Sequence, residues 1–250
     1  MLRKRLVTVL TFNDGILFRT KQFNPDYRYT ANFVDTWSVD EIVALDITRS
    51  GGEGRLDRGS FLEALRGLAK RCFVPMAAGG GVRDLDDVRS LMANGADKIV
   101  VNTGAIERPE LIAQIAQSYG RQCVILSIDA KRAGDSYEVR SRFGAYPTGL
   151  TVEEWARRGA ELGAGEILIT SIDRDGSLEG YDLDLCRRVV ASVSVPVLVS
   201  GGAGSWKHFV EGIDHGGASA VCTSNIYHFT ETSLKSAKSY MANAGTPVRI

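Results

Sequence analysis

Two glycine-rich segments of the sequence contain the residue types that bind phosphate. One spans residues 78–81 and the other residues 200–204, and each lies between an apolar run and the expected start of a helix, at Asp84 and Ser205. Glycines let backbone N–H groups approach an anion closely, and a helix N-terminus adds a favourable dipole. Such glycines can also serve tight turns alone, but two equivalent segments favour two phosphate sites. The expected ligand is elongated, with a phosphate at each end.

Polar side chains follow two further apolar runs, next to these glycines. One run ends in Asn102 and Thr103 and another in Thr223 and Ser224, which offer amide and hydroxyl donors. The candidate phosphate-binding residues are therefore Gly80, Gly81, Asn102, Thr103, Gly201, Gly202, Ala203 and Ser224.

Carboxylates stand at the ends of other apolar runs. Asp129 ends one run, Asp46 ends another, and Asp173 and Asp175 follow a third in an Asp-x-Asp-Gly pattern. An aspartate in such a position can act as a general acid or base when neighbouring groups tune its pKa. The alternative is that it caps a loop, which is common for turns of this composition. We take Asp129 and Asp175 as catalytic candidates.

Eight short apolar or β-branched runs must position these residues. They alternate with stretches of helical periodicity, such as residues 61–68 and 111–115. Strands that alternate with helices indicate βαβ units and a parallel sheet. Eight units in 250 residues, without a linker, predict a single (β/α)8 TIM barrel of residues 1–250 rather than an open sheet. The expected strands are residues 6–10, 42–47, 74–78, 99–102, 124–129, 167–170, 195–200 and 218–223.

The two halves of the chain resemble each other. Glu166 begins a segment similar to the one that Glu41 begins, 125 residues earlier. A spacing of half the chain predicts two (β/α)4 halves related by a pseudo-twofold axis along the barrel. The repeat makes Thr11 the partner of Asp129, so a symmetric pair of aspartates is absent. The expected halves are residues 1–120 and 121–250.

Four charged residues stand at the starts of the expected strands. In a TIM barrel the starts ring the bottom opening, while the loops at the strand ends form the active site. Opposite charges there can pair into a plug or gate, although they can also serve solubility or stability alone. The four residues are Arg5, Glu41, Lys98 and Glu166.

The composition excludes several classes of protein. Thirty basic and thirty acidic residues give no net charge, which argues against nucleic-acid or anionic-membrane binding. The four cysteines are far apart and the three histidines form no ligand pattern, so we expect free thiols, no metal and no cofactor. No apolar run is long enough to span a membrane and no signal peptide is recognisable. A cytoplasmic protein is expected.

Seven segments, in order along the whole chain, resemble the cyclase subunit of imidazole glycerol phosphate synthase, a family of histidine biosynthesis. The resemblance implies a glutaminase partner at the barrel bottom, which releases ammonia into the barrel. At the top, ammonia attacks a bisphosphorylated ribulosyl–formimino–aminoimidazole nucleotide, which is cleaved and cyclised. The segments are LDIT (45–48), GGG (79–81), GADK (95–98), IDAK (128–131), GAGEI (163–167), TSIDRDG (170–176) and VSGGAG (199–204).

The resemblance also implies roles for single residues. Asp129 matches one of two catalytic aspartates, the acid of ring closure. The charged residues at the strand starts match the family's ammonia gate. Gly81, Asn102 and Thr103 match one phosphate site of the family, and Gly202, Ala203 and Ser224 match the other.

Three departures from the family fall on the first strand and its loop. The second catalytic aspartate, a general base, is replaced by Thr11, whose hydroxyl cannot act as a base near neutral pH but can hold a water, so Thr11 is a third catalytic candidate. The family's first-loop lysine aligns with Arg19, which can bind phosphate but cannot exchange protons. Residues 20–30 lack the family's lid pattern. Loss of a general base typically costs ~10²–10⁴-fold in rate. The sequence leaves open whether another group, such as Asp14 or Asp175, has taken over the role of base.

Three functions are therefore open. The first is a working cyclase. The second is a paralogue that channels ammonia to another acceptor, such as an amidino group on a bacterial surface sugar, since relatives with that role resemble residues 23–27. The third is a non-catalytic barrel that only binds and activates a glutaminase, and it should not bind a bisphosphate.

Overall fold

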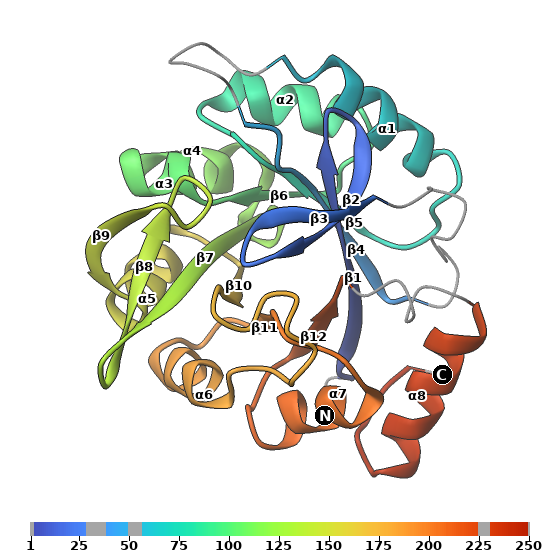
Figure 1. Ribbon diagram of the computed structural model, residues 1–250. Helices are drawn as coiled ribbons and strands as arrows, with labels where there is room; N and C mark the ends of the chain where they lie inside the picture. The colour runs from blue at the N-terminus through green and yellow to red at the C-terminus, as the bar shows by residue number, and fades with distance from the viewer. Residues whose placement is uncertain (1–2, 29–38, 50–56, 225–230, 250) are drawn as a thin grey trace.

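The computed structural model describes residues 3–28, 39–49, 57–224 and 231–249. Within them, eight parallel strands close into a barrel that is surrounded by helices, which confirms the predicted TIM barrel (Figure 1). All eight expected strands are present, and three of them begin two residues later than expected. In barrel order the strands are β1 (Arg5–Asn13), β4 (Glu41–Asp46), β5 (Met76–Gly79), β6 (Lys98–Val101), β7 (Val124–Ala133), β10 (Glu166–Ser171), β11 (Val197–Ser200) and β12 (Ala220–Thr223).

The helices pack their apolar faces on the outside of the barrel. In the first of them, the buried residues Phe61, Leu65 and Leu68 recur at the spacing of one helix face. Both expected helix starts are confirmed, since Asp84 and Ser205 are the N-cap residues of α2 and α7. The helices are α1 (Gly59–Ala69), α2 (Leu85–Ala93), α3 (Thr103–Glu107), α4 (Glu110–Tyr119), α5 (Val152–Leu162), α6 (Leu183–Ser192), α7 (Trp206–Asp214) and α8 (Glu231–Asn243), with a 3₁₀ turn at Arg121–Cys123.

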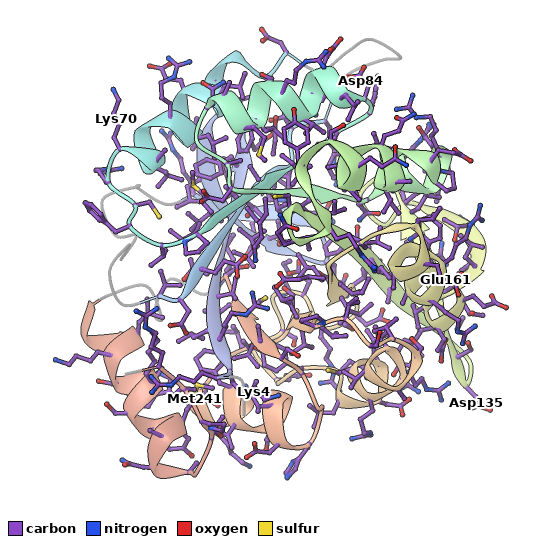
Figure 2. All side chains as sticks on the ribbon, turned by 180° about the vertical axis from the view of Figure 1, so that it is seen from behind. Lys4, Lys70, Asp84, Asp135, Glu161 and Met241 are labelled. Atoms are coloured by element: carbon purple, nitrogen blue, oxygen red, sulfur yellow. The ribbon has the colours of Figure 1, made fainter. Side chains whose placement is uncertain are left out.

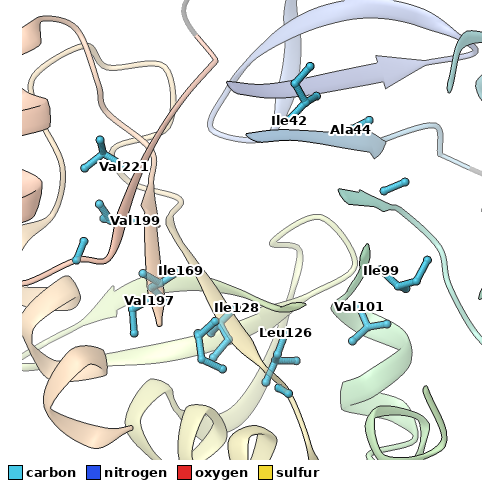
Figure 3. Close-up of a cluster of buried hydrophobic side chains, with 14 of the residues drawn as sticks. Ile42, Ala44, Ile99, Val101, Leu126, Ile128, Ile169, Val197, Val199 and Val221 are labelled. Atoms are coloured by element: carbon cyan, nitrogen blue, oxygen red, sulfur yellow. The ribbon is translucent and has the colours of Figure 1, made fainter. Parts of the chain in front are cut away.

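The strands separate two hydrophobic cores. The outer core lies between the sheet and the helices and includes Ile42, Val101 and Ile128 (Figure 3). The inner core fills the barrel and includes Val7, Val9 and Leu168. This division follows from the two-residue period of a strand, which sends alternate side chains to opposite faces.

Two antiparallel hairpins extend the barrel wall, and the sequence did not predict them. The first barrel strand continues into β2 (Ile16–Lys21) and β3 (Asn24–Arg28). The fifth continues into β8 (Ser136–Ser141) and β9 (Tyr146–Thr151), and Asp135 marks the outer end of this hairpin (Figure 2). Residues 20–28 of the segment expected to lack the family's lid pattern thus belong largely to the first hairpin, and residues 29–30 lie outside the described residues.

The inner faces of β1 and β7 each carry a row of side chains from the barrel bottom to its top. On β1 the row passes through Val7 and Val9 and reaches Thr11. On β7 it passes through Ile125 and reaches Asp129. Thr11 pairs with Leu45 of the next barrel strand, and Asp129 pairs with Thr170, which occupies the same place 125 residues later. The strand register therefore makes Thr11 the counterpart of Asp129.

Further features of the described residues bear on the expectations from composition. Cys72, Cys123, Cys186 and Cys222 are free thiols. None of the described helices combines the length and the hydropathy needed to cross a membrane. Among the described residues, no group of three His, Cys, Asp or Glu side chains could hold a metal ion.

Candidate active site

A cavity opens at the C-terminal ends of the strands, on the side of the second glycine-rich segment. Its wall comes from β2, from the loop after β10, from the loop after β11 and from the end of β12. The structure brings together here six residues that the sequence proposed: Arg19, Asp175, Gly201, Gly202, Ala203 and Ser224.

Backbone geometry requires the glycines of this second loop. Gly201 and Gly202 have φ angles of 90° and 103°, a region that favours glycine. A Cβ atom at Gly202 would lie 2.2 Å from the carbonyl oxygen of Gly180. That neighbour donates its N–H to the carbonyl of Gly202 at 2.8 Å, and Gly204 donates its N–H to Nδ1 of His208 at 3.1 Å. The second loop is thus held by one backbone and one imidazole contact.

The first glycine-rich loop is supported by a buried arginine instead. Gly80 has a φ angle of 104°, and a Cβ atom there would lie 2.1 Å from the carbonyl oxygen of Asp46. Arg58 donates a hydrogen bond to the carbonyl of Gly80 and lies 3.7 Å from the carboxylate of Asp87. Asp87 in turn accepts the N–H of Arg83 at 2.8 Å. Sequence reasoning missed Arg58 because its role depends on this tertiary contact alone.

Asp129 stands at the top of β7 between the two loops. The Asn102 side chain, which follows β6, is hydrogen-bonded to it. Burial raises the pKa of Asp129 to about 7, the Asn102 bond opposes this rise, and the charge of Asp175 adds to it. A carboxyl group with this pKa is partly protonated at neutral pH, as a general acid requires.

Thr11 is engaged within its own hairpin. Its hydroxyl donates a hydrogen bond to the carbonyl oxygen of Phe18, the residue opposite it on β2. The Thr11 side chain is only 7% exposed. Its one proton is therefore directed at the backbone rather than at a ligand, although the oxygen keeps its lone pairs.

Asp175 joins the first hairpin to the loop after β10. Its carboxylate accepts the N–H of Phe23 at 3.0 Å and a hydrogen bond from the Thr20 side chain, and its carbonyl accepts the N–H of Gln22 at 3.2 Å. Burial raises the pKa of Asp175 above its usual value, although the two hydrogen bonds to its carboxylate and the charge of Arg19 oppose this rise. A role as a substitute base stays a prediction, since these contacts also give the carboxylate a structural role.

The other two carboxylates accept hydrogen bonds from the backbone. Asp46 caps its own loop, the alternative open for it from the sequence, while Asp173 joins its loop to β7. Asp46 is buried and its Oδ1 accepts the N–H of Thr48 at 3.1 Å and the Thr48 hydroxyl at 2.6 Å. Asp173 accepts the N–H of Arg132 at 3.0 Å.

The four charged residues at the barrel bottom form a closed ring of ion pairs, which we call the bottom ring. Arg5 lies 2.6 Å from Glu41 and 2.9 Å from Glu166. Lys98 lies 2.7 Å from Glu41 and 3.2 Å from Glu166. Each charge contacts two of opposite sign, and the ring lies below the inner apolar core. The structure thus brings all four predicted residues together.

The sequence was compared with known proteins, and the similarity extends over nearly the whole chain. The family model described as "Histidine biosynthesis protein" matches residues 7–233. The chain is also 42% identical, over 254 aligned residues, to the imidazole glycerol phosphate synthase subunit HisF of Hyphomonas neptunium. The alignment covers 100% of this chain and 99% of that protein. The chain therefore belongs to the histidine biosynthesis protein family, and within it to the imidazole glycerol phosphate synthase cyclase subunits that its residues resemble.

Proposed function

We propose that the chain is a cyclase-type subunit that uses ammonia from a glutaminase partner. The substrate is a bisphosphorylated ribulosyl–formimino–aminoimidazole nucleotide. Its cleavage and ring closure yield imidazole glycerol phosphate and an aminoimidazole carboxamide ribotide. The observation that carries this proposal is the placement of these residues on the inner faces of the strands. The bottom ring lies at one end of the barrel, and Asp129 lies at the other end between the two glycine loops.

Ammonia would enter at the bottom, where the glutaminase docks. The bottom ring closes this opening, so one ion pair must part for a molecule to pass. Above the ring the inner core is apolar, with Val7, Val9 and Leu168 among its residues. A neutral molecule such as ammonia loses less hydration free energy there than ammonium would, because an apolar interior disfavours charge.

At the top, the two loops would hold the two phosphates and set the reacting atoms beside Asp129. Arg19 adds a permanent positive charge to the second site, where it shares the cavity with Gly202 and Ser224. Asp129, protonated near neutral pH, would supply the proton for ring closure. Asp175 is the candidate base, because it is the carboxylate whose charge acts on Asp129. No cofactor enters this scheme.

The contact of Thr11 favours a second candidate function. A hydroxyl that donates to Phe18 does not replace the carboxylate that the family has as a base at this position. A paralogue that delivers ammonia to another acceptor would keep the bottom ring and the phosphate loops without needing that base. The third function, a silent barrel that activates a glutaminase, predicts that bisphosphates do not bind. A cytoplasmic location accompanies all three proposals.

The test is ammonium-dependent turnover of the bisphosphorylated nucleotide by the native chain and by Thr11→Asp. Turnover by the native chain supports the cyclase and shows that another group serves as base. An inactive native chain with an active Thr11→Asp variant would overturn it in favour of ammonia delivery elsewhere. Absence of bisphosphate binding would leave only the silent barrel.

A further inference from the structure

The second hairpin places an arginine on the same side as Asp129. Arg140 of β8 lies directly opposite Asp129 of β7 in the antiparallel register. Directly opposed residues of two strands project to the same face of a sheet. The other face of β8 carries Tyr137 and Val139, which are buried in the outer core. Arg140 therefore belongs to the face that looks into the mouth of the barrel.

Arg140 also lies close to the first phosphate loop along its own strand. Two residues after it, the N–H of Arg142 donates to the Thr103 hydroxyl at 3.0 Å. Thr103 follows β6 and is one of the predicted phosphate-binding residues beside that loop. Asn102, its neighbour, is hydrogen-bonded to Asp129, the residue opposite Arg140.

The guanidinium of Arg140 forms one ion pair and has one buried N–H donor without an acceptor among the described residues. Its Nη2 lies 3.1 Å from the carboxylate of Glu138, which is fixed by the N–H of Gly149 at 3.2 Å. Its Nε is buried, and none of the described residues accepts a hydrogen bond from it. A buried donor without an acceptor is unfavourable, so a ligand oxygen there would be stabilising.

We infer that Arg140 binds the substrate phosphate at the first phosphate site, which is formed by Gly80 and Gly81 of the first loop and by Thr103 after β6. The inference rests on the proposed function and names a specificity-determining residue for it. An arginine presents its donors as a planar fork that matches phosphate oxygens. Glu138 orients this fork in the absence of ligand and competes with phosphate for it.

The experiment is a titration of ¹⁵N-labelled protein with inorganic phosphate, followed through the amide resonances of Gly81 and Gly202. These two resonances report on the two loops separately. Arg140→Met is expected to weaken phosphate binding at Gly81 by roughly ten-fold or more and to leave Gly202 within about two-fold. Arg140→Lys keeps the charge but not the planar fork of donors. Its phosphate affinity at Gly81 should therefore lie between those of the native chain and Arg140→Met.

Glu138→Gln separates binding from a merely structural ion pair. If Arg140 binds phosphate, removal of its competitor should strengthen binding at Gly81, the opposite direction to Arg140→Met. If the pair only supports the hairpin, both variants weaken binding at both loops, and the inference fails. Arg89→Met is the control: it removes an exposed arginine paired with Asp86, so phosphate binding at Gly81 and at Gly202 should stay unchanged.

Two results overturn the inference in distinguishable ways. Native affinity at Gly81 in Arg140→Met would remove Arg140 from the site and leave the proposed function standing. Absence of phosphate binding at Gly81 in the native chain would remove both the inference and the first phosphate site.

Discussion

The two hairpins at the barrel mouth share one architecture but place different groups at equivalent positions. In the first, Thr11 of β1 faces Phe18 of β2 and donates its hydroxyl to the backbone of that residue. In the second, Asp129 of β7 faces Arg140 of β8, and its carboxyl group is hydrogen-bonded to Asn102. Strand register is thus retained where side-chain chemistry has changed. At this one position the second hairpin has an ionisable group, while the side chain of the first is part of the hairpin's own hydrogen bonding.

The two glycine loops repeat this lesson. Both have glycines at positive φ packed against a neighbouring carbonyl, which is the geometry expected of loops that bring backbone N–H groups near an anion. Their supports differ, since Arg58 holds the first loop and Gly180 with His208 holds the second. Symmetry therefore extends to the backbone of each site and not to the residues behind it.

Removal of the ionisable group of Asp129 should have the largest effect on turnover. Asp129→Asn cannot donate a proton as an acid, and ammonium-dependent turnover is expected to fall by roughly 10²–10⁴-fold. Steady-state kinetics with the bisphosphorylated nucleotide measure the change. Phosphate binding at Gly81 and Gly202 should stay close to native and serves as the control for folding. A variant with near-native turnover would exclude Asp129 as the acid.

The bottom ring offers a second contrast, between a buried ring of charges and an exposed ion pair on α7. Lys98→Met leaves Glu41, which is 2% exposed, without one of its two cationic partners. We expect a loss of about 3 kcal/mol in the free energy of unfolding, measured in urea. Lys207→Met, which breaks an exposed pair with Glu211, should cost less than ~1 kcal/mol. Equal losses in the two variants would mean that the ring is solvated.

The strands, the glycine loops and the bottom ring could be predicted because their signals are local. Alternating apolar residues mark a strand, and a charge at its start marks one end of the barrel. The hairpins were not predicted, although Asp14-Gly15 between β1 and β2 and Gly134 between β7 and β8 are residues typical of hairpin turns. The turns that follow carry a weaker signal, since non-glycine residues such as Phe23 and Arg142 take positive φ there. The support by Arg58 escaped for another reason. It contacts Gly80, 22 residues away, and no pattern in the sequence joins the two.

The two loop supports can be compared directly. Arg58→Met removes a charged donor from the carbonyl of Gly80 and leaves Asp87 buried without this partner, so the KM for the bisphosphate should rise by roughly ten-fold. His208→Ala removes one acceptor from the N–H of Gly204 and should raise KM by about three-fold. Phosphate titrations at Gly81 and Gly202 should show each loss at its own loop. A loss shared by both loops would contradict independent supports.

The raised pKa of Asp129 predicts a pH dependence of stability. Burial favours its neutral form in the folded chain, so its contribution is full below about pH 4 and is lost as the pH rises to about 7. Asp129→Asn removes this ionisation. The Tm of the variant should therefore gain on the native Tm between pH 4 and 7, by a few degrees, and the gap should stay constant above pH 7. A gap that is constant from pH 4 to 9 would contradict a raised pKa.

The smallest effect is expected for substitutions of Thr11. They decide whether the Thr11 hydroxyl has only a structural role in the first hairpin. Thr11→Val keeps the shape but removes the donor to Phe18, so the free energy of unfolding should fall by about 1 kcal/mol. Thr11→Ser keeps the hydroxyl and should lose less. If the hydroxyl only closes the hairpin, ammonium-dependent turnover by folded Thr11→Val should remain within about two-fold of native. A larger loss of turnover without a loss of stability would show that the Thr11 oxygen holds a reacting water, and the two sides of the mouth would then share the chemistry.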